Sequence, residues 1–593
     1  MEYWLNVLDN VLIFSIFAMS LNLLLGYAGQ VSVAHAAFGA IGGYTAAYIS
    51  LHYGVHFVPA VLIGTLAAAA CGTGVSLPAL RLSTEYLILL TIAVSSIVIA
   101  IATSVPALGG SYGLLGRHPA ELSPLPGGPL LNPSQWVGPL AVAAALVYLG
   151  CWRLGESPFG RVLRGIREDE VATRALGKDV FRYKTAVFGV TAGMAGLAGA
   201  LLFYYNQLVS PGVYGFSVSL VIFTMVIFGG MGNLAGSILG AGVLVLLQPV
   251  LERLVQLSPE QASLTRLVIY GAGLAVLMRL RPQGALPEGT SLAGLVRRRG
   301  PAGRAPASQR AEGRIELVAA AATPSGLDGR DRAPAAATAD TPGVVRVRDL
   351  ARRFGGIVAV DGLDLELRAG LITALVGPNG AGKTTVFNLL TGAVRPDAGT
   401  ILLNGRDVTG MRPDQVTRLG MARSFQDVRV HGRLSALENV MMGVQDQPGE
   451  RLGSLFLTPR RVRRCERETR DRAMDCLRFV GLAELAAAPA GALPFGQQKL
   501  VALARVLATR ADVLLLDEPA SGIDVRWVEP MLELVAGVRA QGKTVCIVEH
   551  NLHVVQQLAD TVCFMELGRV TARGPIRELM RDERLAEAYF GTP

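Results

Sequence analysis

Residues 377–384, GPNGAGKT, have the residue types and spacing of a phosphate-binding loop. They fit the pattern GxxxxGK[ST], whose glycines let backbone N–H groups surround phosphate oxygens. A following helix N-terminus would add positive potential. Lys383 would reach the β- and γ-phosphates, and Thr384 could ligate Mg²⁺. The preceding LITALVG has the composition of a buried strand, which predicts a strand, loop and helix around a nucleotide. The residues of this loop expected to contact ATP are Gly377, Pro378, Asn379, Gly380, Ala381, Gly382, Lys383, Thr384 and Thr385.

Two later apolar runs end in residues suited to hydrolysis. VLLLDEP is a predicted buried strand that ends in Asp517 and Glu518. Asp517 would lie near Mg²⁺, directly or through water, and Glu518 would polarise the water that attacks the γ-phosphate. TVCIVEH is another predicted strand and ends in His550, a candidate γ-phosphate contact. Gln426, in ARSFQDVRV, lies between the phosphate loop and the carboxylate pair in the sequence.

The composition divides the chain of 593 residues into two halves. Overall 51% of the residues are hydrophobic and 17% are charged, but apolar runs recur before residue 283 and a soluble mixture follows residue 341. The net charge of +9 could indicate nucleic acid. Much of the excess lies in short loops beside apolar segments, where membrane topology places basic residues. Six cysteines lack metal-binding spacing and indicate small, mostly buried residues in a reducing compartment: Cys71, Cys151, Cys465, Cys476, Cys546 and Cys563.

Nine apolar segments are candidates for membrane spans, each of which needs about 20 residues. They lie near 7–27, 31–51, 57–80, 86–105, 136–155, 184–205, 213–231, 234–252 and 264–282. The last is the weakest because Arg266 interrupts it and must reach an interface. The stretch 213–252 could instead be re-entrant. The N-terminus lacks the features of a cleaved signal peptide, so the first segment is expected to remain as an anchor.

The distribution of Lys and Arg predicts the orientation. The segment 153–184 is rich in both and is therefore expected in the cytoplasm. The chain after Arg279 must also be cytoplasmic, because it leads to an ATP site. Four candidate spans separate these regions, and five precede them, which puts the N-terminus in the periplasm. Span interiors hold almost no ionisable residues, so an ion gradient is not expected to supply the energy.

A short amphipathic helix is predicted within this cytoplasmic segment, near 157–177. Ser157 is a plausible N-cap followed by Pro158 at the first helical position. An apolar face recurs at helical spacing, and Gly177 is a reasonable C-terminal stop. The residues of that face are Phe159, Val162, Leu163 and Ile166. The helix could lie on the bilayer surface or dock into the soluble half, and the ATP motifs favour docking.

Residues 283–341 are rich in Ala, Gly, Pro and Arg and show little periodicity. Such a segment cannot bury a core, so a flexible linker is expected. The predicted domains are therefore a membrane domain at 1–282 with eight or nine spans, the linker at 283–341, and a nucleotide-binding domain at 342–593.

The motifs of the second half resemble the ATP-binding-cassette (ABC) family, in the family's own order. That resemblance implies an α/β P-loop ATPase with a RecA-like core and a helical subdomain, after an all-α transmembrane permease domain. It makes Lys383, Gln426, Glu518 and His550 the catalytic residues. It also makes Thr384, Gln426 and Asp517 the ligands of Mg²⁺.

The same resemblance implies further contacts with ATP. Phe354, in ARRFGG, would stack on adenine, and Asp524, in SGID, matches the D-loop. The signature motif departs from the commonest LSGGQ, because Pro494 and Phe495 replace Ser and the first Gly. Gly496 and Gln497 remain as nucleotide contacts.

Both halves resemble branched-chain amino acid ABC importers. LPFGQQ and GMARSFQDVRV resemble the LivG-type ATPase, whereas SLNLLLGYAGQVSVAHAAFGAIGGYTA and GRVLRGIREDEVATRALG resemble the LivM-type permease. The resemblance implies an inner-membrane importer that uses ATP and Mg²⁺. It implies a second permease and a second cassette, or another copy of this chain, and an extracytoplasmic binding protein. The amphipathic helix would be the coupling helix.

Other functions remain open at the level of sequence. Relatives of such importers carry urea, short amides or aromatic acids by the same mechanism. An ABC exporter also places its membrane half first, but usually has six spans with long cytosolic extensions. A soluble P-loop signalling protein does not fit the membrane spans, and a role in nucleic-acid binding is not expected.

Overall fold

The computed structural model describes residues 2–79, 84–116, 132–281 without 254 and 257, 283–289, and 343–579. The chain forms two compact units. Unit 1 comprises Met1–Arg167 and Phe181–Gly303, and unit 2 comprises Glu168–Val180 and Arg304–Pro593.

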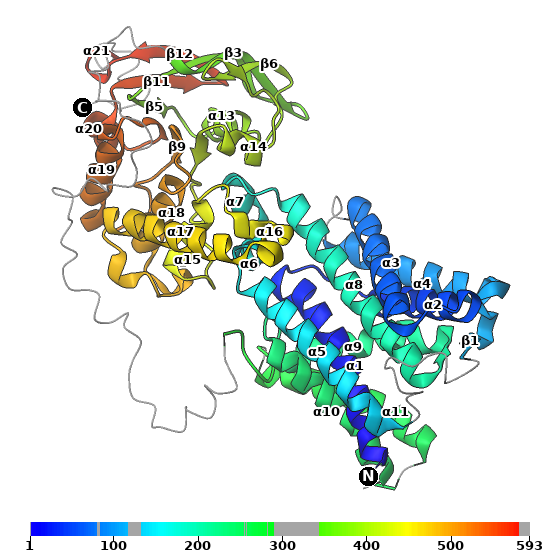
Figure 1. Cartoon of the computed structure of the whole chain (residues 1–593). Coiled ribbons are helices and arrows are strands. Elements are labelled where there is room, and N and C mark those ends of the chain that lie inside the picture. Colours follow the sequence, from blue (N-terminus) through cyan, green and yellow to red (C-terminus); the bar gives the residue numbers. More distant parts are fainter. Residues whose placement is uncertain are drawn as a thin grey trace, which may run out of the picture. The chain divides into compact units, whose positions relative to one another are not determined.

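Unit 1 is built almost entirely from helices, in agreement with the predicted all-α first half (Figure 1). The first helix continues into a π-helical turn, η1 (Leu23–Tyr27), and a two-residue antiparallel pair joins β1 (Leu114–Leu115) to β2 (Leu208–Val209). The helices are α1 (Glu2–Asn22), α2 (His35–Tyr53), α3 (Phe57–Ala79), α4 (Thr84–Ser104), α5 (Pro133–Gly155), α6 (Pro158–Glu168), α8 (Val180–Asn206), α9 (Phe216–Gly229), α10 (Leu234–Arg253) and α11 (Pro259–Leu280).

Seven helical segments in the described part of the chain are long and apolar enough to cross a membrane. They are Glu2–Tyr27, Phe57–Ala79, Glu85–Ser104, Pro133–Gly155, Val180–Asn206, Pro211–Gly229 and Leu234–Arg253. The other two predicted spans are also helical and correspond to α2 and α11. In α11 the apolar part is the shorter Val268–Leu280. The expectation of eight or nine crossings stays a prediction.

Small residues that recur at four-residue spacing, such as Gly236 and Gly240, allow helices of unit 1 to approach closely. A Cβ atom built on Gly240 of α10 would lie 2.1 Å from the carbonyl oxygen of Met225 in α9. One built on Gly236 would lie 2.4 Å from the carbonyl oxygen of Gly229. Backbone therefore packs against backbone where α9 and α10 meet.

Residues 283–289 differ from the expectation of a flexible linker that begins at 283. The N–H groups of Ala285 and Leu286 donate to carbonyl oxygens at the end of α9, at 2.9 and 3.0 Å. The side chain of Leu286 is buried. These contacts make the stretch part of the core of unit 1. The remaining expected linker, 290–341, lies outside the described residues.

Unit 2 contains two sheets, as an α/β ATPase requires (Figure 1). The larger has the order β12-β11-β5-β10-β9-β8, with all neighbours parallel except β12 against β11. Its strands are β5 (Ile372–Val376), β8 (Met421–Arg423), β9 (Val513–Asp517), β10 (Thr544–Val548), β11 (Thr561–Glu566) and β12 (Arg569–Gly574). The antiparallel sheet β4-β3-β6-β7 comprises β3 (Gly343–Phe354), β4 (Ile357–Arg368), β6 (Ala398–Leu403) and β7 (Arg406–Asp407).

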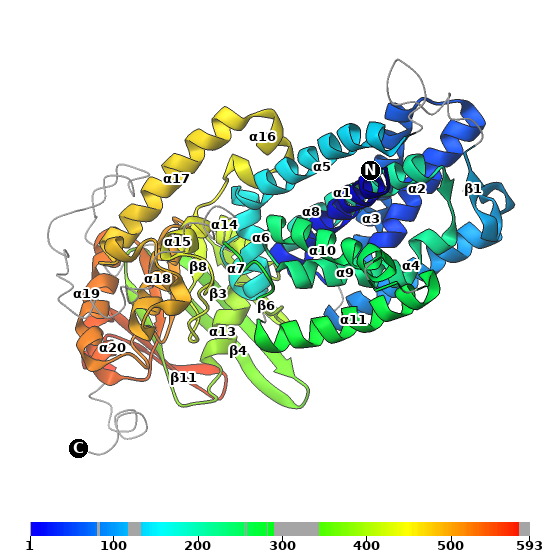
Figure 2. The same cartoon turned by 90° about the horizontal axis from the view of Figure 1, so that it is seen from below.

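Strands β5, β9 and β10 are buried along their whole length, because one face of the larger sheet packs against helices and the other packs largely against the antiparallel sheet. Strands buried on both faces have continuous apolar sequences instead of alternating apolar and polar residues. These strands could therefore be predicted from their apolar runs. Helices α15, α17 and α18 lie side by side in both views (Figure 1 and Figure 2). The helices of unit 2 are α7 (Glu170–Ala175), α13 (Lys383–Leu390), α14 (Pro413–Arg418), α15 (Ala436–Gly443), α16 (Leu452–Leu457), α17 (Pro459–Phe479), α18 (Phe495–Leu507), α19 (Val525–Ala540), α20 (Leu552–Leu558) and α21 (Ile576–Leu579).

We predict that Gly240→Ala destabilises unit 1 and that Gly242→Ala does not. The added methyl at 240 meets a backbone carbonyl that cannot move freely, so overpacking should lower the free energy of unfolding by about 1–3 kcal/mol. At Gly242 of the same helix, the new Cβ would lie 3.9 Å from a Val11 methyl, an ordinary contact. Unfolding in mixed micelles measures both variants, and equal stabilities would contradict the close approach of α9 and α10.

Candidate functional site

Three parallel strands bring the predicted nucleotide residues to one edge of the larger sheet. Val548 of β10 pairs with Leu375 of β5 on one side and with Asp517 of β9 on the other. The residues that follow these strands therefore leave the sheet together, at its carboxyl edge. This is the edge at which α/β sheets bind ligands.

The phosphate loop has the backbone that its glycines permit. Gly380 and Gly382 have φ angles of 84° and 99°, in the left-handed region that side chains rarely adopt. A Cβ atom on Gly377 would lie 2.1 Å from the carbonyl oxygen of Met565, so this position also requires glycine. The remaining loop residues, with Thr384 and Thr385 in the first turn of α13, complete the strand–loop–helix unit.

Lys383 lies inside this loop. Its Nζ donates hydrogen bonds to the carbonyl oxygens of Gly377 and Pro378, at 2.7 and 2.9 Å. Burial lowers the pKa of Lys383, and the negative charges of Glu518 and Asp517 oppose that shift. The ammonium group is therefore close enough to the carboxylate pair to interact with it through space.

Asp517 is buried at the end of β9 beside an arginine. Arg423 Nη2 donates to its Oδ2 at 2.7 Å, and both side chains are almost fully buried. Burial raises the pKa of Asp517, and Arg423 opposes this. Asp517 Oδ1 is buried with no hydrogen-bond partner among the residues that the structure describes. An oxygen of this kind fits a Mg²⁺ ligand, because Mg²⁺ prefers oxygen donors.

The sequence patterns did not identify Arg423 as part of the site. It lies in β8, three residues before Gln426, and β8 pairs with β9. Its guanidinium group also lies over the ring of Phe425, 5.2 Å from the centroid. The one sequence signal that could have identified Arg423 is that it is a charged residue at the end of a short apolar run.

Glu518 lies between the two side chains expected to assist it. Gln426 Nε2 donates to Glu518 Oε2 at 3.0 Å. His550 Nδ1 lies 3.8 Å from Glu518 Oε1. Glu518 has a φ of 46°, which is unusual for a residue other than glycine and is a form of strain that concentrates at functional sites. The structure therefore brings Lys383, Gln426, Asp517, Glu518 and His550 into one cluster.

The remaining predicted ATP contacts lie on other elements. Phe354 ends β3 and is 44% exposed, with the guanidinium of Arg352 4.9 Å from its ring centroid. Pro494 is the N-cap of α18, so the helix begins at Phe495, with Gly496 and Gln497 in its first turn. Asp524 caps α19 and accepts from the N–H of Arg526 at 3.1 Å. Roles for these residues in ATP binding stay predictions.

The segment predicted as one helix near 157–177 is two helices, α6 and α7. Asp169 interrupts the helix in an extended conformation, and its carboxylate caps α7 by accepting from the N–H of Ala172 at 2.9 Å. Ser157 Oγ accepts from the N–H of Gly160 at 3.2 Å, as expected of an N-cap. Gly177 has a φ of 80° just past α7, as its predicted role as a stop requires.

The apolar face of α6 belongs to the core of unit 1, which corrects the expectation that this face docks into the soluble half. Phe159, Val162, Leu163 and Ile166 are all buried, and the Phe159 ring lies 5.2 Å from that of Tyr183. The residues that contact the ATPase are those that follow, mostly through polar groups, together with Leu176, which is buried against Leu434 and Met442.

Residues 168–180, here called the docking segment, are held on the ATPase by hydrogen bonds and ion pairs. Lys178 is fully buried, donates to the carbonyl oxygen of Val444 at 2.8 Å and pairs with Glu450. Arg412 pairs with Asp179 at 2.9 Å. Carbonyl oxygens of the segment also accept from side chains of the ATPase, which are Thr417, Arg418 and Gln445.

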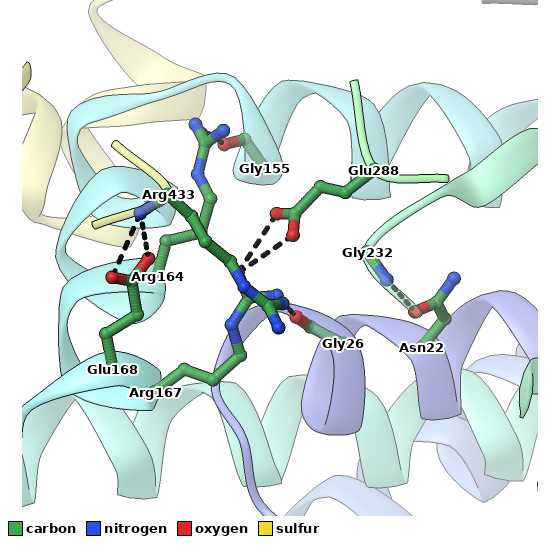
Figure 3. Close-up of polar contacts among 9 residues, drawn as sticks. All are labelled: Asn22, Gly26, Gly155, Arg164, Arg167, Glu168, Gly232, Glu288 and Arg433. Atoms are coloured by element: carbon green, nitrogen blue, oxygen red, sulfur yellow. Dashed lines mark hydrogen bonds and ion pairs between the residues drawn. The ribbon is translucent and has the colours of Figure 1, made fainter. Parts of the chain in front are cut away.

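The stretch that begins at Gln426 connects the nucleotide cluster to the docking segment. Arg429 pairs with Asp169 at 3.1 Å. The N–H of Arg433 donates to both carboxylate oxygens of Glu168, at 3.2 Å each (Figure 3). A movement of Gln426 would therefore reach the docking segment within a few residues of chain.

Arg167, the residue before the docking segment, is held within unit 1. It donates to the carbonyl oxygen of Gly26 in η1 and forms an ion pair with Glu288 at 2.9 Å (Figure 3). Asn22 also fixes this end of α1, because its Oδ1 accepts from the N–H of Gly232 at 2.8 Å. We call the Arg167–Glu288 pair with its bond to Gly26 the latch.

Comparisons with known proteins agree with the predicted membrane half and with the predicted ATPase half. The family described as the branched-chain amino acid transport system permease component matches residues 3–277, and the ABC transporter family matches residues 360–521. The chain is 36% identical over 249 residues to the high-affinity branched-chain amino acid transport ATP-binding protein LivG of Salmonella typhimurium. It is 36% identical over 250 residues to BraF of Pseudomonas aeruginosa, which carries the same description.

Each of these two relatives is covered over 98% of its length and aligns with 42% of this chain. Among solved structures, a nucleotide-free ATP-binding cassette from an ABC transporter is 30% identical, with a TM-score of 0.37. The alignment covers all of that cassette and 42% of this chain.

We predict that Lys178→Ala releases the docking segment and that Arg174→Ala does not. Removing one partner of a buried ion pair costs about 3–5 kcal/mol, whereas the exposed Arg174–Glu170 pair contributes at most about 1 kcal/mol. Hydrogen exchange at the amides of 176–180 measures the difference, and protection should fall roughly a hundredfold or more in the first variant. Unchanged protection would contradict the anchoring role of Lys178.

Proposed function

We infer the function from the premise that this chain belongs to the family of branched-chain amino acid ABC transporters, with a permease component and an ATP-binding component in one polypeptide. We propose that it is an importer subunit that moves branched-chain amino acids across the bacterial inner membrane by hydrolysing ATP. The observation that carries the proposal is the cluster at the carboxyl edge of β5, β10 and β9, in a chain whose residues 3–277 match a permease. The relatives named above favour branched-chain amino acids over urea, short amides or aromatic acids.

The permease domain is proposed to comprise 1–282 together with the packed stretch 283–289, with the N-terminus in the periplasm. The nucleotide-binding domain is proposed to span 342–593. ATP would be held by the phosphate loop, with Lys383 on the β- and γ-phosphates and Phe354 against adenine. Thr384, Gln426 and Asp517 would hold Mg²⁺, which supplies charge neutralisation at the phosphates. Glu518 would orient the attacking water, with Gln426 and His550 beside it.

A second cassette would complete each ATP site. Gly496, Gln497 and Asp524 belong to motifs that face the phosphate loop of another cassette in the family that this chain resembles. The partner would be a second permease and ATPase, or a second copy of this chain. An extracytoplasmic binding protein would deliver the substrate and select it.

We also propose that the latch and the docking segment transmit force. Arg167 and Glu168 are consecutive, yet the first is bonded within unit 1 and the second within unit 2. The loop from Gln426 to Arg433 would shift the docking segment when the γ-phosphate is bound or lost. Arg167 would pass that shift to η1 through the carbonyl of Gly26.

Replacing Glu518 by Gln should leave ATP bound and prevent its hydrolysis. The amide keeps the size of the side chain but cannot accept the proton of the attacking water, and loss of a general base typically costs 10²–10⁴-fold in rate. Phosphate release and retention of ATP by the complete assembly measure the two effects. Turnover at the normal rate would reject Glu518 as the base.

Replacing Arg167 by Gln should lower uptake more than ATPase activity. The variant loses the ion pair with Glu288 and the charge on the bond to Gly26, but leaves the nucleotide cluster intact. The ratio of leucine uptake to ATP hydrolysis in proteoliposomes should fall about tenfold. Arg164→Gln, on the same helix and bonded only to the carbonyl of Gly155 in the described contacts, serves as the control. Equal ratios in the two variants would contradict the force-transmitting role of the latch.

A further inference from the structure

A cavity of ≈ 280 Å³ lies in unit 1 among α1, α9, α10 and α11. It approaches the size of small-molecule pockets, which begin at about 300 Å³. On α1 it is lined by residues from Tyr3 to Phe14, and on α10 by residues from Leu244 to Glu252. These helices lie side by side, and α6 lies at the opposite end of unit 1 (Figure 1).

The cavity is at the end of unit 1 remote from the latch. Phe14 precedes Gly26 by twelve positions, which corresponds to roughly 18 Å along a helix. The orientation predicted from basic residues places the N-terminal end of α1 in the periplasm. The cavity would therefore face the side from which an importer receives its cargo.

Two opposite charges line this cavity within a membrane domain that has few charges. Glu252 is on α10 and Arg266 is on α11. Arg266 Nη1 donates to Gln248 Oε1, and Gln248 Nε2 donates to Glu252 Oε1 at 2.9 Å. Gln248 thus bridges the two charged groups and holds them apart. Ionisable side chains inside membrane domains are costly and commonly mark binding sites or pathways.

Both charged side chains have hydrogen-bonding groups left for a ligand. Arg266 Nε is buried and has no hydrogen-bond partner within the part of the chain that the structure describes. A guanidinium edge of this kind can bind a carboxylate through two parallel hydrogen bonds. Glu252 accepts one hydrogen bond, from Gln248, in the part of the chain that the structure describes, and a carboxylate offers about four acceptor positions.

The rest of the lining is largely apolar. Val221 and Met225 of α9, with Phe14 of α1 and Leu244 of α10, provide aliphatic and aromatic surface. A cavity with one cation, one anion and an apolar wall matches a zwitterion that carries a hydrocarbon side chain. An α-amino acid such as leucine has this chemistry.

We propose that this cavity binds the transported amino acid, with its carboxylate on Arg266, its ammonium on Glu252 and its side chain against the wall from α9. The inference rests on the proposed function and adds the site at which the permease holds its substrate. Gln248 acts as the spacer that sets the distance between the two charged groups.

The test is direct binding by the complete assembly in nanodiscs, without ATP and without the binding protein. The probes are L-leucine, 4-methylpentanoate, which lacks the ammonium, and 3-methylbutylamine, which lacks the carboxylate. The wild-type protein should prefer leucine over both analogues by at least about tenfold, because each loses a charge-assisted hydrogen bond.

Substituting Glu252→Gln should remove the preference for leucine over 4-methylpentanoate and keep the preference over the amine. Arg266→Gln should do the reverse, and Arg266→Lys should restore part of the lost affinity. Glu2→Gln is the control, because Glu2 is exposed on α1 and does not line the cavity. These opposite patterns cannot arise from general misfolding, which would weaken all three probes together.

Binding of leucine within twofold of wild type by both variants would overturn the proposal. So would a pattern in which the two variants change only the retention of phosphatidylethanolamine against phosphatidylcholine, because the cavity would then hold a lipid headgroup. Uptake assays separate this inference from the proposed function. ATP-dependent leucine uptake that persists in both variants rejects the cavity alone, whereas its absence from the wild-type assembly rejects import.

Discussion

The structure depends on one charged junction in the chain, between Arg167 and Glu168. Arg167 is held by Glu288 and the carbonyl of Gly26 in the helical unit. Glu168 is held by the backbone of Arg433 in the ATPase unit. A single peptide bond joins the two residues, so the contacts of the two units meet at adjacent positions in the chain. The proposed function uses this junction to pass a shift from one set of contacts to the other.

The apolar face of α6 and the docking segment are held by different kinds of contact. The apolar face of α6 is buried among helices, whereas the docking segment is bound by ion pairs and by hydrogen bonds to carbonyl oxygens. Buried charges must be paired, and Lys178 illustrates this with its bonds to Val444 and Glu450. Such pairs specify one docked arrangement, because alternatives would leave a charge without its partner.

In the proposed function, one chain both hydrolyses ATP at the nucleotide cluster and holds the transported amino acid in the cavity. The cluster is formed by strand ends that the parallel register holds together, and Arg423 fixes Asp517 from a fourth strand. The cavity lies among helices that pack closely through glycine. In the proposed cycle, the latch near η1 and the cavity near the start of α1 belong to opposite ends of the same helix. Rotation or tilt of α1 would connect them.

The sequence by itself determined the phosphate loop, the carboxylate pair, the helical first half and the α/β second half. Those features depend on residues close together in the chain, so spacing and hydrophobic pattern suffice. The break at Asp169, the packing of 283–289, the role of Arg423 and the pairing of Gln248 with Glu252 and Arg266 were decided by tertiary structure. Most of these depend on a partner far away in sequence, the break at Asp169 depends on a side chain that caps a backbone N–H, and the Gln248–Glu252 bond, although local, is part of a network completed by Arg266 from the next helix. Local pattern carries no information about such partners, because the energy that selects them exists only once the chain has folded.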